Sequence, residues 1–189
     1  MGKIHVELTA ELQAFIRAQR MFFVASAPDD PDGHINLSPK GHDSLLILDP
    51  QTLAYLDLTG SGIESVAHIK ENGRFVMMFC SFDAAPLILR LHGVAEVIEA
   101  GTPEWAKLRP LFPALPGARA IIRLSLRRIA DACGWGVPRY EFIESRDDYA
   151  RVAARLGSEG LERARARANA VSINGLPGLT SAVVEPPNS

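Results

Sequence analysis

The sequence predicts a mainly β fold (β+α), in which a closed or half-closed barrel carries peripheral helices. Three observations support this prediction. Short apolar or alternating segments recur along the chain, clusters of Gly, Pro, Asp and Asn separate them, and only short helical patterns lie between them. With 189 residues, of which 47% are hydrophobic, the chain is long enough for one domain with a substantial core.

Seven segments have the composition or the two-residue alternation of strands. They span residues 21–26, 35–38, 44–48, 53–57, 74–82, 87–98 and 120–129. The first two are expected to pair as a hairpin, because residues 27–33 between them are rich in Asp, Pro and Gly. The third and fourth are expected to form a second hairpin around the turn at residues 49–52.

Helical patterns occur at both ends of the chain and between strands. The first expected helix follows Thr9, a typical N-cap, and buries a stripe of Leu12, Phe15 and Ile16. The other expected helices span residues 63–71, 103–112, 147–156 and 158–169. The last two belong to a helical C-terminal extension (residues 146–189) of the main domain (residues 1–145), because they carry no apolar run large enough for a separate core.

A polar turn formed by Ser38, Pro39, Lys40 and Gly41 is the first candidate ligand-binding segment. Pro39 fixes its own φ angle and keeps Ser38 extended, while Gly41 lets the chain turn away. Lys40 is thereby held on a short constrained segment, where it is suited to bind a phosphate. The alternative is a solvated lysine at an ordinary turn.

A second turn, formed by Thr59, Gly60, Ser61 and Gly62, leads from a strand into a helix. Ser61 and Glu64 have the spacing of a capping box, which predicts that the helix begins at this turn. The free N–H groups and the dipole of such a helix N-terminus favour a phosphate or another anion. The alternative is an ordinary strand-to-helix connection capped by Ser61. Walker A and GxGxxG nucleotide motifs are absent from the sequence.

These turns and four further segments resemble the pyridoxamine 5'-phosphate oxidase-like flavoproteins. The similar segments are NLSPKG (36–41), YLDLTGSG (55–62), ENGR (71–74), MFC (78–80), LILRLHG (87–93) and CGWGVP (133–138). They follow one another in the order of that family. The resemblance implies a split β-barrel of the FMN-binding type, which forms a homodimer and binds FMN at the subunit interface.

The resemblance also implies that residues 38–40 and 59–62 lie beside the flavin and its ribityl phosphate. The function implied is that of an FMN-dependent oxidoreductase whose substrate the sequence does not identify, and the alternative is a non-catalytic protein that binds a flavin, heme or deazaflavin. Gly62, Ile63 and Glu64 follow Ser61 where the oxidase itself has basic residues. The resemblance therefore indicates the family and not the oxidation of pyridoxamine phosphate.

Arg90 and Trp135 are two further candidate cofactor-binding residues. In a dimer, Arg90 could reach the flavin of the partner subunit, and a surface or interface ion pair is an equal alternative. Glycines flank Trp135, so its indole could cover a planar ligand or anchor a subunit interface, with packing in the core as the alternative.

Composition argues against several other classes of function. The 20 basic and 22 acidic residues give a net charge of −2, so no basic field across the domain attracts nucleic acid. Two cysteines are too few for a disulfide scaffold, and the five histidines lack metal-ligand spacing. We expect a cytoplasmic protein, since no apolar run reaches membrane-spanning length and no signal-peptide pattern begins the chain. No catalytic acid or base can be named from the sequence.

Overall fold

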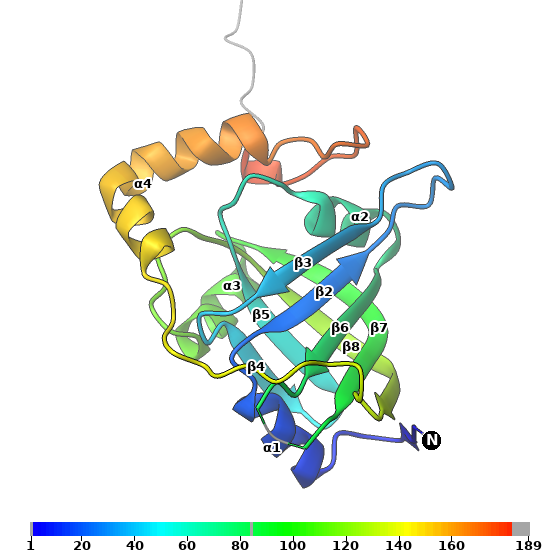
Figure 1. Cartoon of the computed structure of the whole chain (residues 1–189). Helices are drawn as coiled ribbons and strands as arrows, with labels where there is room; N and C mark the ends of the chain where they lie inside the picture. Colours follow the sequence, from blue (N-terminus) through cyan, green and yellow to red (C-terminus); the bar gives the residue numbers. More distant parts are fainter. Residues whose placement is uncertain (1, 84, 183–189) are drawn as a thin grey trace, which may run out of the picture.

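Eight strands form one antiparallel sheet in the computed structural model, which describes residues 2–83 and 85–182 (Figure 1). The strands are β1 (Ile4–His5), β2 (Phe22–Ser26), β3 (Asn36–Lys40), β4 (Leu45–Asp49), β5 (Thr52–Leu58), β6 (Arg74–Cys80), β7 (Ile88–Glu99) and β8 (Ala118–Ala132). They follow one another across the sheet in the order β3-β2-β6-β7-β8-β5-β4, and β1 pairs with β8. The sheet curls into a barrel that stays open between its edge strands β3 and β4.

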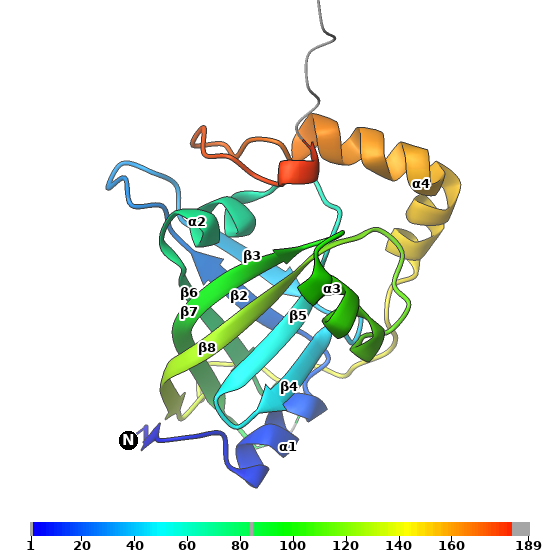
Figure 2. The ribbon, with the colours of Figure 1, turned by 180° about the vertical axis from the view of Figure 1, so that it is seen from behind.

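Helices cover the ends and one side of the barrel. They are α1 (Ala10–Ala18), α2 (Glu64–Asn72), α3 (Pro103–Leu108) and α4 (Asp148–Ala168), with short 3-10 turns at Arg109–Leu111 and Thr180–Ala182. Figure 2 shows α3 on the side of the barrel opposite β2 and β3, and α4 beyond one end of the sheet. Residues 183–189, at the end of the expected C-terminal extension, lie outside the described residues.

The core follows from the alternation of the strands. Along β2, Phe22, Val24 and Ser26 are buried while Phe23 and Ala25 are half-buried, so successive side chains point to opposite faces of the sheet. Tyr55, Met77, Leu91 and Ile122, each from a different strand, have no exposed surface inside the barrel. α1 closes one end of this core with Leu12 and Ile16. As predicted, Thr9 caps α1, because its side-chain oxygen accepts a hydrogen bond from the Leu12 N–H.

The end of the first hairpin differs from the expectation. We expected the strand to stop at Ser38, but β3 continues through Pro39 to Lys40, with Pro39 opposite Phe23 of β2. Proline fits here because β3 is an edge strand, so the missing N–H costs no bond to a neighbouring strand. The turn that we expected at Ser38 therefore begins at Gly41.

The C-terminal extension contains the two expected helical segments. They form α4, which is interrupted at Gly157, where φ is 65° and ψ is −177°. This conformation is essentially confined to glycine, since a side chain would collide with the backbone. The kink directs the second half of α4 across the connection between β5 and α2 (Figure 1).

Candidate functional site

A network of charged side chains links the two turns that the sequence singled out. Lys40 Nζ lies 2.9 Å from Asp57 Oδ1. The other carboxylate oxygen of Asp57 accepts a hydrogen bond of 2.7 Å from Arg119 Nε. Arg119 also donates from Nη1 to the Gly62 carbonyl, at 2.9 Å. The end of β3 is thereby connected, through β5 and β8, to the Thr59–Gly62 turn.

This network is buried and carries a net positive charge. The side chain of Asp57 is only 1% exposed and that of Arg119 only 5%. Burial by itself raises the pKa of Asp57, but the charges of Lys40 and Arg119 outweigh it, so this pKa lies below its ordinary value. One carboxylate between two cations leaves one excess positive charge, which favours an anion nearby.

Lys40 is not the solvated turn lysine that the sequence allowed as an alternative. Its side chain is 22% exposed, and Nζ lies 5.5 Å from the centre of the Tyr55 ring. An ammonium group has three N–H donors, and Asp57 uses one of them. Lys40 can therefore hold Asp57 and still donate to a ligand in the adjoining cavity.

The first of two adjoining cavities, which we call the strap cavity, has a volume of about 550 Å³. Pro39 and Lys40 of the first turn and Thr59 of the second all line it. Met21, Leu56, Leu58 and Phe142 give it apolar walls. Its outer wall is the strap, an extended segment of residues 139–147 that leads to α4 and is yellow in Figure 1. A pocket of this size and mixed lining suits a small organic ligand.

The strap is attached at several points. The Tyr140 N–H donates to the Phe82 carbonyl at 2.7 Å, and the rings of these two residues lie 5.7 Å apart. The guanidinium of Arg20 lies over the Phe142 ring, 5.1 Å from its centre. These contacts hold the first part of the strap, including Phe142, against the barrel.

The second cavity, which we call the helix cavity, has a volume of about 710 Å³ and lies between α4 and the second turn. Thr59, Gly60 and Ser61 line one side of it, and Arg163 and Arg167 of α4 line the other. Thr59 and Tyr149 line both cavities. The two cavities are therefore neighbours, and one elongated ligand could extend from one into the other.

The backbone of the second turn is arranged with its carbonyls toward the protein. The Asn169 side chain donates to the carbonyls of Gly60 and Gly62, and Arg119 donates to the latter as well. Within residues 2–83 and 85–182, the N–H groups of Gly60, Ser61 and Gly62 have no protein acceptor. The N–H groups of Gly60 and Ser61, which line the helix cavity, remain for solvent or a ligand.

The predicted capping role of Ser61 is wrong. The N-cap of α2 is Ile63, which makes no side-chain capping bond, and Ser61 is exposed. The Glu64 carboxylate lies beside Gly62 and accepts a hydrogen bond from the Ile173 N–H, and it makes no capping bond to Ser61. The turn is therefore fixed by Arg119 and Asn169 and not by a capping box.

Ser38 lies away from the strap cavity on the inward side of β3. Its hydroxyl donates to the Asn36 side chain, which in turn donates to Ser65 of α2. This places Ser38 in a hydrogen-bonded row that connects β3 with α2. The structure thus brings Pro39, Lys40 and Thr59 into one cavity, with Gly60 and Ser61 in its neighbour, and leaves Ser38 beside them.

Arg90 and Trp135 do not line either cavity. Arg90 lies on the outer face of the sheet. It pairs with Met78 of β6, which pairs with Phe23 of β2, which pairs with Pro39 of β3, so these four residues lie in one row across the strands. Three strand spacings, or about 14 Å, separate Arg90 from Pro39 along this row. Among the described residues, no carboxylate lies within ion-pair distance of Arg90.

Trp135 is 83% exposed, which excludes the core-packing alternative. It follows Gly134, whose φ of 65° and close approach to the Leu87 backbone leave no room for a side chain. The outer face of the sheet also exposes apolar residues, with Ile35 at 77% and Leu37 at 65%. Ile35 and Leu37 lie two residues apart on this face, and exposed apolar side chains of this kind are typical of a protein contact surface.

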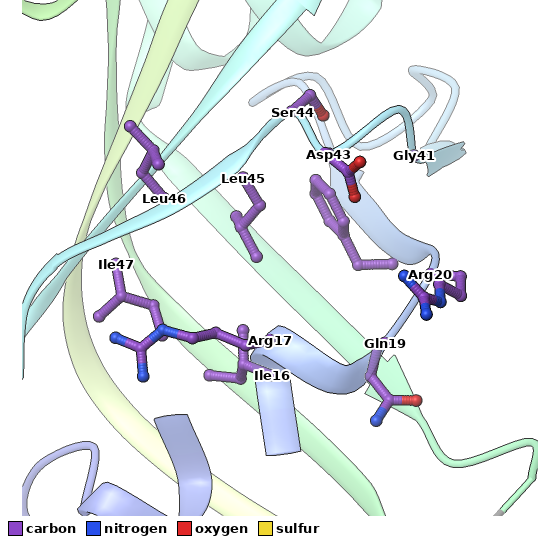
Figure 3. Close-up of a pocket in the computed structure, with 11 residues that line it drawn as sticks. Ile16, Arg17, Gln19, Arg20, Gly41, Asp43, Ser44, Leu45, Leu46 and Ile47 are labelled. Carbon is purple, nitrogen blue, oxygen red and sulfur yellow. The ribbon is translucent and has the colours of Figure 1, made fainter. Parts of the chain in front are cut away.

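A further cavity of about 420 Å³ lies between α1 and β4. Figure 3 shows the Arg17 guanidinium beside Ile47 and Arg20 at the opposite end of the group of lining side chains. Neither Lys40 nor the second turn lines it. It therefore lacks the groups that distinguish the other two cavities.

Sequence reasoning missed four residues that shape the site, namely Asp57, Arg119, Tyr149 and Asn169. Asp57 could have been found, because a charged residue in the apolar strand pattern of residues 53–58 implies a buried partner. The others lie far from the turns in the sequence. The hydroxyl of Tyr149 is buried, has no hydrogen-bond partner among the described residues, and lies against Gly117.

Two absences apply to the part of the chain that the structure describes. No group of three or more His, Cys, Asp or Glu side chains is placed to hold a metal ion in residues 2–83 and 85–182. Nor does this part of the chain contain a helix with the length and apolar character needed to cross a membrane.

Comparisons with known proteins agree with this architecture. A family model described as pyridoxamine 5'-phosphate oxidase matches residues 8–133. The pyridoxamine 5'-phosphate oxidase family protein ustO of Aspergillus flavus is 38% identical over 200 residues, which cover 97% of this chain and 80% of that protein.

Solved structures show the same fold at lower sequence identity. HupZ of Group A Streptococcus is 24% identical, with a TM-score of 0.52, and the match covers 64% of this chain and 90% of that chain. A Lactobacillus delbrueckii chain, named as a candidate pyridoxamine 5'-phosphate oxidase, is 24% identical, with a TM-score of 0.51 and coverage of 65% and 93%. The expected split β-barrel is thereby confirmed.

Proposed function

The chain belongs to the pyridoxamine 5'-phosphate oxidase family, and on this premise we propose that it binds FMN in the strap cavity and acts as an oxidoreductase. The observation that carries the proposal is the convergence of Pro39, Lys40 and Thr59, from two separate turns, on one cavity. Membership of the family supports a flavin as the ligand class, and the positive charge of the site favours a flavin that carries a phosphate.

The residues present fit such a group. The strap cavity combines apolar walls with Lys40, and together with the helix cavity it offers space of the order that organic cofactors occupy. Tyr149 lines both cavities, and its buried hydroxyl, which lies against Gly117, has no hydrogen-bond partner among the described residues. When bound, FMN would supply the redox chemistry, since its ring system accepts and donates electrons or hydride.

The protein groups have distinct tasks in this proposal. Lys40 donates to an anionic or carbonyl oxygen of the ligand, and Asp57 with Arg119 holds Lys40 in place. Met21, Leu58 and Phe142 exclude water from the planar part of the ligand. Pro39 supplies a rigid edge, and Thr59 keeps its backbone position by donating to the Gly117 carbonyl through both N–H and hydroxyl.

We also propose a homodimer that packs through the outer face of β3, β2 and β6. The support is the exposed apolar surface at Ile35 and Leu37 and the position of Pro39 at the edge of both this face and the strap cavity. Arg90 lies about 14 Å from Pro39 of its own chain. In the proposed dimer, the Arg90 and Trp135 side chains of the partner subunit could approach the ligand instead.

The direct test is the absorbance spectrum of the purified protein, followed by addition of a reduced nicotinamide. A bound flavin gives visible absorbance, and bleaching by the donor supports the oxidoreductase. A flavin that stays oxidised with both NADH and NADPH would contradict the oxidoreductase and leave a flavin-binding protein. A colourless protein whose melting temperature is unchanged by added FMN would contradict flavin binding itself.

A further inference from the structure

The helix cavity carries positive charge that has no assigned role and lies next to the proposed cofactor site. Of the described residues that line it, the charged ones are both arginines, Arg163 and Arg167, and none is acidic. A third arginine of the same helix, Arg165, donates to the Thr59 hydroxyl at 3.3 Å. The C-terminal half of α4 therefore carries its basic side chains to the second turn.

These arginines are available to a ligand. The partner of Arg163 is Glu159, one turn earlier, at 3.5 Å, and both side chains are exposed, so this pair contributes little. Arg167 is exposed and has no ion-pair partner among the described residues. A guanidinium group with free donors on a planar fork is well suited to a phosphate.

The opposite wall of the cavity supplies complementary donors. Gly60 and Ser61 are exposed and line it, and their backbone N–H groups have no acceptor within the described part of the chain. Asn169 and Arg119 hold the carbonyls of the turn toward the protein. Repulsion from carbonyl oxygens is thus reduced at the point where the arginines approach.

The rest of the lining is apolar and comes from α4, with Val152, Leu156 and Leu161. An apolar wall beside a cluster of N–H and guanidinium donors fits the end of an organic phosphate better than a free inorganic ion. The shared residues Thr59 and Tyr149 connect this region with the strap cavity.

We propose that the helix cavity is a phosphomonoester subsite, in which Arg163 and Arg167 of the C-terminal helix and the N–H groups of Gly60 and Ser61 bind the phosphate of a ligand. The ligand that we favour is FMN, and this choice of ligand rests on the proposed function. A phosphate carried by a substrate would use the same donors. The C-terminal extension is then part of the binding site and not a structural appendage.

The test compares FMN with riboflavin, which lacks only the phosphate, by fluorescence titration of the flavin-free protein. The full-length protein should bind FMN more tightly by at least about tenfold, since a single charge-assisted hydrogen bond is worth about that factor or more. Arg163→Gln combined with Arg167→Gln should remove most of this preference and leave riboflavin affinity unchanged. Arg155→Gln is the matched control, because Arg155 is an exposed arginine of α4 that does not line the cavity.

Inorganic phosphate, followed by the melting temperature, distinguishes the possible sources. If FMN and riboflavin bind equally but phosphate raises the melting temperature of the wild type and not of the double variant, the subsite is supported and the phosphate belongs to another ligand. If neither flavin binds and phosphate has this selective effect, the proposed function fails and the subsite stands. The inference is overturned if the double variant keeps the same preference for FMN over riboflavin as the Arg155→Gln control. It is also overturned if the wild type shows no such preference and phosphate does not raise its melting temperature selectively.

Discussion

Asp57 is the residue on which the geometry of the two turns depends, because it bridges Lys40 and Arg119 in the interior. We expect Asp57→Asn to lower the free energy of unfolding by about 3 to 5 kcal/mol, since it leaves the buried Arg119 and the partly buried Lys40 without their carboxylate. Urea denaturation measures this loss. Asp32→Asn, at an exposed turn position, is the control and should change stability by less than about 0.5 kcal/mol.

The pH dependence of stability gives a second prediction for the same residue. The pKa of Asp57 is lower in the folded protein than its ordinary value, so its stabilising effect is complete above the unfolded pKa of about 3.9 and is lost as pH falls through the folded pKa. The stability difference between wild type and Asp57→Asn should therefore be constant near neutral pH and shrink below about pH 5. A difference that stays constant through the acid range would contradict the buried ion pairs.

At the scale of elements, the kink of α4 at Gly157 sets where the C-terminal half of the helix lies. Alanine at this position must either adopt a conformation that costs about 1 to 3 kcal/mol or let the helix run straight. We expect Gly157→Ala to reduce hydrogen-exchange protection in residues 148–156 while the barrel strands keep theirs. Gly136→Ala is the control, because Gly136 has no positive φ and open space around it. Identical exchange in both variants would show that the kink does not position α4.

The elements show how far sequence reasoning can reach. The alternation of apolar residues located both hairpins and the long strands, and the two separate helical patterns at residues 147–156 and 158–169 agree with the break in α4 at Gly157. The continuation of β3 through Pro39 was missed because only the sheet order reveals that β3 is an edge strand. Local patterns carry no information about which strand lies at an edge.

The residues that hold the two turns in place could not be predicted from local sequence patterns. Both turns were recognised from local chemistry, but the residues that fix them are distant in the sequence. Arg119 lies 62 residues from Asp57, and Arg165 lies 106 residues from Thr59. Such pairs arise from the way the strands and α4 pack. The contact of Arg165 with Thr59 depends on the direction that the second half of α4 takes after Gly157, which no local sequence pattern gives.

At the scale of the whole molecule, the proposed dimer predicts a mass twice that of the 20.5 kDa chain. Leu37→Asp places a charge on the exposed apolar face of β3 and should weaken association by about 2 kcal/mol or more. Light scattering during size-exclusion chromatography measures the change. Leu111→Asp, at an exposed position of the 3-10 turn that follows α3, is the control and should leave the mass unchanged. A wild type that elutes as a monomer would contradict the dimer.

The central claim is that two turns of one chain, joined through Lys40, Asp57 and Arg119, form a flavin site. Native mass spectrometry of the full-length protein after incubation with FMN tests it most directly. The account predicts the added mass of one FMN for every chain, retained at low collision energy and lost in Asp57→Asn. A spectrum that shows only the unliganded protein, with FMN in excess, would contradict it.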